Sequence, residues 1–228
     1  MIAGILPPWV VSCERTTDVG EDDLFPAELQ TLTRSVAKRR AEFSTVRYCA
    51  RQALAQLGLP PAPILPGERG APQWPDGVVG SMTHCDGYRA AILARDSQAA
   101  GLGVDAEPHG PLPDGVLGLV SLPEERLRLA DLVAAEPAVH WDRLLFTVKE
   151  SVYKVWFPIA RQWLDFAGAS VEFEPGVNDG GSVTGRFTAE LQVPGPEVNG
   201  AELKRLHGRY LVANGLVISA IALEREPA

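Results

Sequence analysis

The stretch FTVKESVYK, from Phe146 to Lys154, decides how the rest of this chain is interpreted. Its apolar positions recur at helical intervals, and we expect the helix to end where Pro158 cannot continue it. Residues four apart on a helix share a face, so Glu150 and Lys154 bring a carboxylate beside an ammonium group.

A second stretch, GVDAEP, is expected at the end of a strand. Because successive side chains of a strand point to opposite faces, one face carries Leu102, Val104 and Ala106. The opposite face carries Gly103, Asp105 and Glu107. The two acids therefore point the same way. Together with Glu150 they suit a hard cation such as Mg2+, with Mn2+ as the alternative, because Mg2+ commonly binds few protein carboxylates plus substrate phosphates.

Each stretch alone has a simpler interpretation. Glu150 could pair with Lys149 or Lys154 on a solvated helix face, and Asp105 and Glu107 could cap a turn. Either stretch by itself favours that simpler interpretation. The two together favour a site.

The order of the two stretches resembles the paired signature of the 4'-phosphopantetheinyl transferases, in the branch that activates surfactin synthetase. A third stretch, GSMTHCDGYRAAI from Gly80 to Ile92, is similar to that family's Ser-x-Ser/Thr-His strand and turn. The resemblance extends from Arg34 to Leu223 and is closest to members like enterobactin synthase component D and to actinobacterial members.

This resemblance implies an α/β (α+β) fold of two similar halves related by approximate two-fold symmetry. Each half is a small, mostly antiparallel sheet packed with a long helix, and the cofactor lies between them. We expect residues 1–100 to form the N-terminal half, with the coenzyme A phosphate-binding helix and loop. Residues 101–228 then carry the metal site and the catalytic helix.

The residue pattern supports alternating elements of this kind. We expect a helix that is stopped by Gly58 and Pro60, and another that starts with Ser121 as its cap. Asn214-Gly215 is a strong hairpin signal. The strands are expected at Met1–Val11, Gly77–Thr83, Tyr88–Arg95, Ala100–Asp105, Val171–Phe173, Ser182–Leu191, Leu206–Val212 and Leu216–Leu223.

The first long helix carries a run of cations, for which a solvated basic face is the ordinary interpretation. Arg40, Arg47 and Arg51 fall on one stripe, however, and a bound polyanion would relieve their mutual repulsion. The resemblance implies coenzyme A as that polyanion and maps contacts to its 3'-phosphate onto Arg39 and Arg47. Whether Arg40 or Arg51 also contributes stays open.

Further cofactor contacts are implied by the resemblance alone. The family's Gly-x-Pro element, which closes over the nucleotide, matches Gly70–Pro72, with Arg69 as its cation. Thr83 and His84 match residues that contact phosphate or pantetheine.

The implied reaction moves the phosphopantetheine arm of coenzyme A onto a serine hydroxyl of an apo carrier protein and releases 3',5'-adenosine bisphosphate. Asp105, Glu107 and Glu150 would hold Mg2+ against the pyrophosphate. Glu150 would also take the serine proton, Lys154 would assist the departing phosphate, and Lys149 would be a further pyrophosphate contact. The partners would be acyl or peptidyl carrier domains of polyketide, nonribosomal peptide, siderophore or fatty-acid systems.

Composition limits the other classes of function. The chain has 228 residues, of which 46% are hydrophobic, so it can bury a substantial core. A formal net charge of -8 speaks against nucleic acid as a partner. Three scattered cysteines fit a reducing cytoplasm, and the apolar N-terminal stretch is too short for a membrane span. The family implies a monomer.

Two rival functions stay open on the sequence. A metal-dependent phosphodiesterase could use the same acids to activate water against coenzyme A or a related nucleotide. A non-catalytic coenzyme A-binding module would need only the cations, although the intact set of acids argues against it.

Overall fold

The structure is a computed structural model that describes residues 1–226. The N-terminal part contains the 3-10 helix η1 (Ile2–Ile5), β1 (Val11–Arg15), α1 (Pro26–Thr31), α2 (Ala37–Gln56), η2 (Glu68–Gly70), β2 (Val78–Cys85) and β3 (Tyr88–Arg95). The remaining elements are β4 (Ala99–Pro108), α3 (Val116–Val120), α4 (Pro123–Ala135), α5 (Trp141–Ala160), η3 (Phe166–Gly168), β5 (Ala169–Phe173), β6 (Val177–Asp179), β7 (Ser182–Leu191), β8 (Glu197–Val198), β9 (Ala201–Glu202), β10 (Arg205–Ala213) and β11 (Leu216–Glu224).

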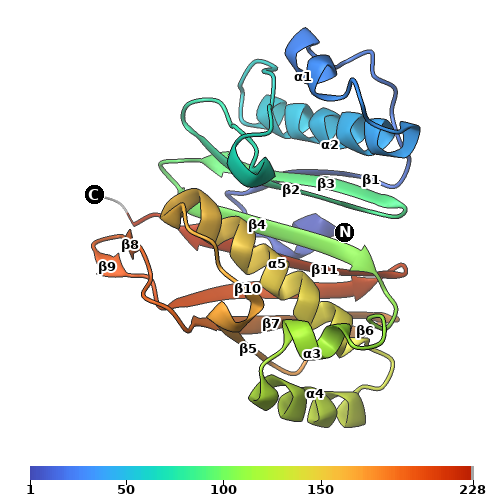
Figure 1. The fold of residues 1–228 in the computed structure, drawn as a ribbon, viewed down its shortest axis with the longest axis vertical. Coiled ribbons are helices and arrows are strands. Elements are labelled where there is room, and N and C mark those ends of the chain that lie inside the picture. Colours follow the sequence, from blue (N-terminus) through green and yellow to red (C-terminus); the bar gives the residue numbers. More distant parts are fainter. Residues whose placement is uncertain (227–228) are drawn as a thin grey trace.

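Two antiparallel sheets, each with a long helix, form the body of the molecule (Figure 1). The smaller sheet has the strand order β1-β3-β2, and α2 covers one of its faces. The larger sheet has the order β4-β11-β10-β7-β5, with β6 paired to β7, and α5 packs across it. This arrangement confirms the predicted α/β fold class. The division at residue 100 stays a prediction.

The sheets share a hydrophobic core. Tyr88, Ala90 and Ile92 of β3 face away from α2 and pack with Leu102, Val104 and Ala106 of β4 and with residues of β11. Since these β4 residues alternate with the acids, their burial in this core turns Asp105 and Glu107 to the opposite face, toward α5.

Close contact between β4 and α5 depends on glycine. A Cβ added at Gly103 would lie 2.1 Å from the backbone oxygen of Ser151, and one at Gly101 would lie 2.9 Å from a methyl group of Val155. Backbone oxygen cannot move aside without moving the helix. Gly103 therefore lets α5 lie directly on the strand that carries the two acids.

Most expected elements are present, with small shifts at their ends. The hairpin at Asn214-Gly215 is confirmed, because both residues have positive φ angles, 53° and 75°, between β10 and β11. The expected strand at Met1–Val11 is wrong: this segment forms η1, and β1 begins only at Val11. Pro7 and Pro8, which lack the N–H that a strand ladder needs, lie between the two.

Two predicted helix ends were also wrong. Ser121 does not cap α4: its backbone N–H closes α3 by donating to Leu117 O at 3.1 Å, and Leu122 is the cap residue of α4. Helix α5 runs through Pro158 to Ala160. A proline so close to a helix end removes one hydrogen bond of the last turns without ending the helix at once.

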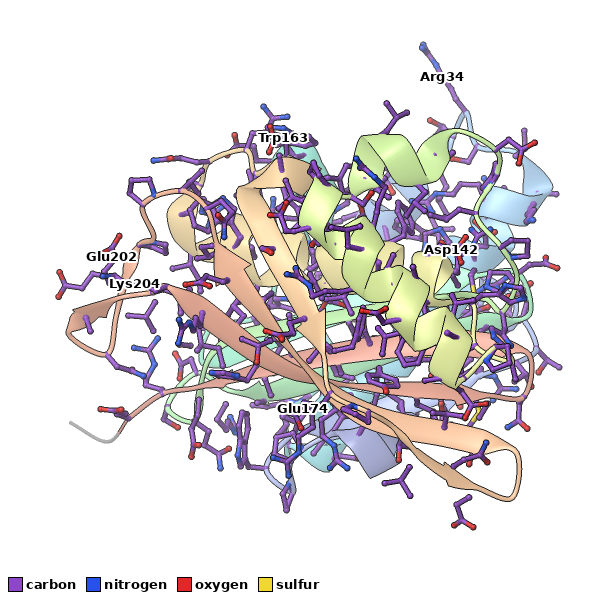
Figure 2. The ribbon with its side chains drawn as sticks, turned by 90° about the horizontal axis from the view of Figure 1, so that it is seen from below. Arg34, Asp142, Trp163, Glu174, Glu202 and Lys204 are labelled. Atoms are coloured by element: carbon purple, nitrogen blue, oxygen red, sulfur yellow. The ribbon has the colours of Figure 1, made fainter. Side chains whose placement is uncertain are left out.

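Arg34, which precedes α2, has a side chain that extends away from the body of the molecule (Figure 2). Within residues 1–226, none of the helices combines the length and hydrophobicity that crossing a membrane requires.

Candidate active site

A cavity of about 930 Å3 lies where α2, the loop around η2, β2, β4 and α5 meet. Six of the residues predicted from sequence line it: Arg39, Arg47, Arg69, His84, Glu150 and Lys154. They come from both sides of residue 100. A second cavity of about 450 Å3, near β10 and β11, is lined by none of the predicted residues.

Asp105 lies beside this cavity and receives hydrogen bonds on one carboxylate oxygen. Lys154 Nζ donates to Asp105 Oδ1 at 2.7 Å and to Val104 O at 2.9 Å. The Thr83 hydroxyl donates to the same Oδ1 at 3.0 Å. Asp105 Oδ2 is buried and has no hydrogen-bond partner among residues 1–226. Oδ1 thus accepts two hydrogen bonds, whereas Oδ2 accepts none from residues 1–226.

The other two acids repel Asp105 and each other. Burial raises the pKa of Glu150, the negative charges of Asp105 and Glu107 raise it further, and Lys154 opposes them. Burial and Asp105 likewise raise the pKa of Glu107, against Arg143 and Lys154. In the part of the chain that the structure describes, Glu150 forms no ion pair within 4.0 Å. The simpler interpretation, in which Glu150 pairs with a neighbouring lysine, therefore finds no support.

Arg143 is a residue of this site that the sequence analysis missed. Its Nη1 donates to Glu107 Oε2 at 3.2 Å. Arg143 lies seven residues before Glu150 and eleven before Lys154, a spacing that keeps all three on one side of α5. That spacing is the signal that could have identified it.

The acids fit a divalent cation held at an open site. Within residues 1–226, no group of three histidine, cysteine or acidic side chains forms a centre that could hold a metal ion by itself, and this includes the predicted set Asp105, Glu107 and Glu150. Mg2+ seldom uses such a centre, because it keeps several waters and binds one or two carboxylates together with substrate phosphates. Asp105 Oδ2, which has no hydrogen-bond partner among residues 1–226, could serve as such a carboxylate ligand. So could the carboxyl group of Glu150, which the negative charges of Asp105 and Glu107 destabilise.

Basic side chains also line the cavity. Arg39 Nη1 donates to His84 Nε2 at 2.8 Å, and the carboxylate of Glu42 lies 3.5 Å from the same ring nitrogen. Arg47 stacks over the ring of Phe43 at 3.3 Å, and burial lowers the pKa of its guanidinium to about 10. Burial of a cation costs free energy unless an anion compensates for it.

The question that the sequence left open about α2 now has a structural answer. Arg40 Nε donates to Glu21 Oε1 at 2.7 Å, and Arg51 forms a buried ion pair with Glu28 at 3.1 Å. Neither residue lines the cavity. Arg40 and Arg51 thus pair with carboxylates of this chain, whereas Arg39 and Arg47 line the cavity.

Arg69 lines the cavity from η2. It has a positive φ of 50°, and its guanidinium lies 5.4 Å from the ring centroid of Trp163. Trp163 is 62% exposed and also contacts the ring of Tyr153 from α5. The loop and the segment after α5 thus meet at the rim of the cavity.

Four predicted residues do not line the cavity: Thr83, Asp105, Glu107 and Lys149. Lys149 is buried on another side of α5, where Nζ donates to Glu125 Oε2 at 2.8 Å and to two backbone oxygens. We therefore leave it out of the proposed site. Thr83 is 1% exposed and does not line the cavity either. Its hydroxyl group instead donates a hydrogen bond to Asp105.

Comparison with known families gives two matches along the chain. A family profile described as "4'-phosphopantetheinyl transferase N-terminal domain" matches residues 27–94. A second, described as "4'-phosphopantetheinyl transferase superfamily", matches residues 101–193. The first match includes α2 and β2, and the second includes most of β4 and all of α5.

Similar proteins align over nearly the whole chain. The chain is 55% identical to 4'-phosphopantetheinyl transferase Svp of Streptomyces mobaraensis, over 98% of this chain and 89% of Svp. It is 48% identical to 4'-phosphopantetheinyl transferase PptT of Mycobacterium tuberculosis, over 98% of both chains. It is also 48% identical to 4'-phosphopantetheinyl transferase Npt of Nocardia iowensis, over 97% of this chain and 99% of Npt.

The fold and these similarities define a class of transferases that are built from two parts, each a sheet with a long helix. The chain belongs to the 4'-phosphopantetheinyl transferase superfamily.

Proposed function

We propose that this protein transfers the 4'-phosphopantetheine group of coenzyme A to a serine hydroxyl of an apo carrier protein. The carrier protein becomes holo, and 3',5'-adenosine bisphosphate leaves. The observation that carries this proposal is one cavity that is lined by Arg39, Arg47 and His84 from α2 and β2 and by Glu150 and Lys154 from α5. The cations of this lining suit a ligand with a 3'-phosphate and a pyrophosphate.

A divalent cation belongs to this proposal. Asp105, Glu107 and Glu150 would hold Mg2+, for which Mn2+ can substitute. When bound, the cation would lower the charge repulsion between the serine oxygen and the pyrophosphate and polarise the reacting phosphorus centre.

The protein's own groups would move the proton. In the transfer, the serine Oγ forms a bond to the phosphorus that bears pantetheine, and the bond from that phosphorus to the bridging oxygen breaks. Glu150 would take the serine proton, and its raised pKa brings its basicity closer to that of an efficient general base. Lys154, whose ammonium lies beside Asp105, would stabilise the charge on the departing phosphate.

The proposed protein partners are acyl or peptidyl carrier domains of polyketide, nonribosomal peptide, siderophore or fatty-acid systems. A carrier serine would enter beside Glu150, at the α5 side of the cavity. We also propose that the enzyme works as a monomer, because one chain lines the whole cavity. We propose the cytoplasm as its compartment, because Cys13, Cys49 and Cys85 are free thiols.

Intact-protein mass spectrometry tests the proposal. An apo carrier protein is incubated with the enzyme, coenzyme A and Mg2+, with and without a chelator, and we expect a cation-dependent gain of one phosphopantetheine group. The Glu150→Gln variant should slow transfer by about 100-fold or more. Glu172→Gln, at an exposed acid of β5, is the matched control and should act like the parent enzyme.

Other results would point elsewhere. Cleavage of coenzyme A to free phosphopantetheine, without modification of any of several carriers, would favour a phosphodiesterase. Intact bound coenzyme A without either product would favour a binding module. Full transfer activity of Glu150→Gln would refute the role of Glu150 as the base.

A further inference from the structure

Two hydroxyl groups of β2 hold the edge of β4 that is not paired with β11. The backbone N–H of Val104 donates to Ser81 Oγ at 3.1 Å, and that of Ala106 donates to Thr83 Oγ1 at 3.2 Å. Ser81 and Thr83 are 3% and 1% exposed. Because Val104 and Ala106 follow the two-residue period of a strand, two alternate side chains of β2 satisfy two alternate N–H groups of β4.

The two hydroxyl groups differ in their second hydrogen bond, which only Thr83 makes to Asp105. Thr83 lies between Ala106 N–H, which can only donate, and Asp105 Oδ1, which can only accept when it is ionised. Its own proton is therefore directed at Asp105. Ser81 makes the same kind of backbone contact without one to Asp105.

Thr83 and Lys154 act on the same oxygen. Both donate to Asp105 Oδ1, at 3.0 and 2.7 Å, and each is also bound to the β4 backbone next to Asp105. These two hydrogen bonds therefore fix the orientation of the carboxylate group through Oδ1. The remaining oxygen, Oδ2, is buried without a partner among residues 1–226.

We propose that Thr83 is a positioning residue that orients the carboxylate of Asp105 so that Oδ2 is presented to the divalent cation. This inference rests on the proposed function, since it assumes that Asp105 binds the cation. It replaces the expected direct contact of Thr83 with coenzyme A by an indirect role. Groups that orient a metal ligand commonly change metal affinity when they are removed.

The chain offers a pair of variants that differ in their contact with Asp105; of the two residues, Ser81 alone also lines the cavity, which is why coenzyme A is kept saturating. Thr83→Ala and Ser81→Ala each remove one hydroxyl from β2 and each leave one N–H of β4 unpaired. Only Thr83→Ala removes a hydrogen bond to Asp105. Thr83→Ser restores the hydroxyl, and Thr83→Val is a second hydroxyl-free variant that keeps the side-chain volume.

Binding of Mn2+ is measured on the full chain with saturating coenzyme A and no carrier protein, by the electron paramagnetic resonance of free Mn2+. Thr83→Ala and Thr83→Val should weaken Mn2+ binding by about tenfold or more. Ser81→Ala should bind Mn2+ nearly as the parent does, and Thr83→Ser should recover most of the affinity. Affinity for coenzyme A in a chelator should be the same for parent and Thr83→Ala.

Three outcomes would overturn the inference. Equal Mn2+ affinities of Thr83→Ala and Ser81→Ala would show that both hydroxyl groups only connect β2 to β4. Loss of coenzyme A affinity in a chelator would show that Thr83 contacts the cofactor directly. A parent protein that binds no Mn2+ would remove the cation from the proposed function and this inference with it. Mn2+ binding that depends on Thr83, without transfer to any carrier, would instead refute the proposed function and support the positioning role.

Discussion

His84 is a single residue whose protonation should report on cofactor binding. Arg39 donates to its Nε2 at 2.8 Å, which requires that nitrogen to be an unprotonated acceptor. Burial lowers the pKa of His84 below its ordinary value, and the positive charge of Arg39 lowers it further. The ring is therefore neutral at physiological pH until an anion approaches.

Coenzyme A should change that state. A phosphate near His84 stabilises the imidazolium, so the pKa in the complex should exceed the pKa in the free protein. Between these two values the complex binds more protons, and coenzyme A affinity should rise as the pH falls through the higher pKa. Calorimetric titration at about pH 6, in two buffers of different ionisation enthalpy, measures this proton uptake.

His84→Gln should abolish the uptake. His109→Gln is the control, because burial also lowers the pKa of His109, which does not line the cavity. Uptake that persists in His84→Gln would assign it to another group.

At the scale of elements, α4 is held on α5 by a buried ion pair. Lys149 Nζ donates to Glu125 Oε2, Phe166 O and Ala169 O at 2.7 to 2.9 Å, so all three of its hydrogens are used. Glu125 also accepts from the backbone N–H of Leu122 and Val171. The two charged side chains are 2% and 1% exposed. Breaking one partner of such a pair leaves an uncompensated buried charge.

Lys149→Met should therefore lower the free energy of unfolding by about 3 to 5 kcal/mol. The double variant Lys149→Met with Glu125→Gln should cost less than the sum of the two single changes, because it leaves no unpaired charge. Urea unfolding of the four proteins completes this double-mutant cycle.

Lys204 supplies the control for this prediction. It pairs with Glu202 at 3.5 Å on the surface, where both side chains are exposed (Figure 2). Lys204→Met should change stability by no more than about 0.5 kcal/mol. A change of similar size in Lys149→Met would show that the buried pair contributes little.

The same elements show what could be predicted from the sequence. The strand period placed Asp105 and Glu107 on one face, and glycine at position 103 lets α5 reach that face. These are local properties. Lys149 was misplaced because the direction of a helical side chain depends on how the helix is rotated, and its partner Glu125 lies on another helix.

The role of Thr83 was hidden for a related reason. Its partner, Asp105, lies 22 residues further along the chain, on a strand that does not pair with β2. The hydrogen bond exists because the two sheets share a hydrophobic core. The local sequence of neither strand predicts that the two sheets pack together. Residue types and spacing thus predicted the set of groups, and tertiary packing decided which of them contact one another.

On the scale of the whole molecule, the cavity lies between the two helix-and-sheet halves. A ligand bound there contacts both, so it should stabilise the complete fold. At a coenzyme A concentration of 100 times Kd, linkage predicts about 2.7 kcal/mol of added stability. Thermal unfolding with increasing coenzyme A measures this gain as a rise in Tm.

Arg39→Ala should reduce the rise with coenzyme A while leaving the rise with 3'-dephospho-coenzyme A nearly unchanged, because Arg39 is expected to contact the 3'-phosphate. Arg34→Ala is the matched control, since that side chain extends away from the molecule (Figure 2). Equal losses with both ligands would place the contact of Arg39 elsewhere on the cofactor.

The pairing of β4 with β11 has a consequence for how the protein is made. Asp105 lies opposite Ser219, on a strand that spans Leu216–Glu224. While a ribosome is still translating, the acids of β4 and the cations of α5 have already emerged, but the strand that fixes β4 in its sheet has not. We therefore expect the nascent chain to lack a working site until Leu216–Glu224 has also emerged.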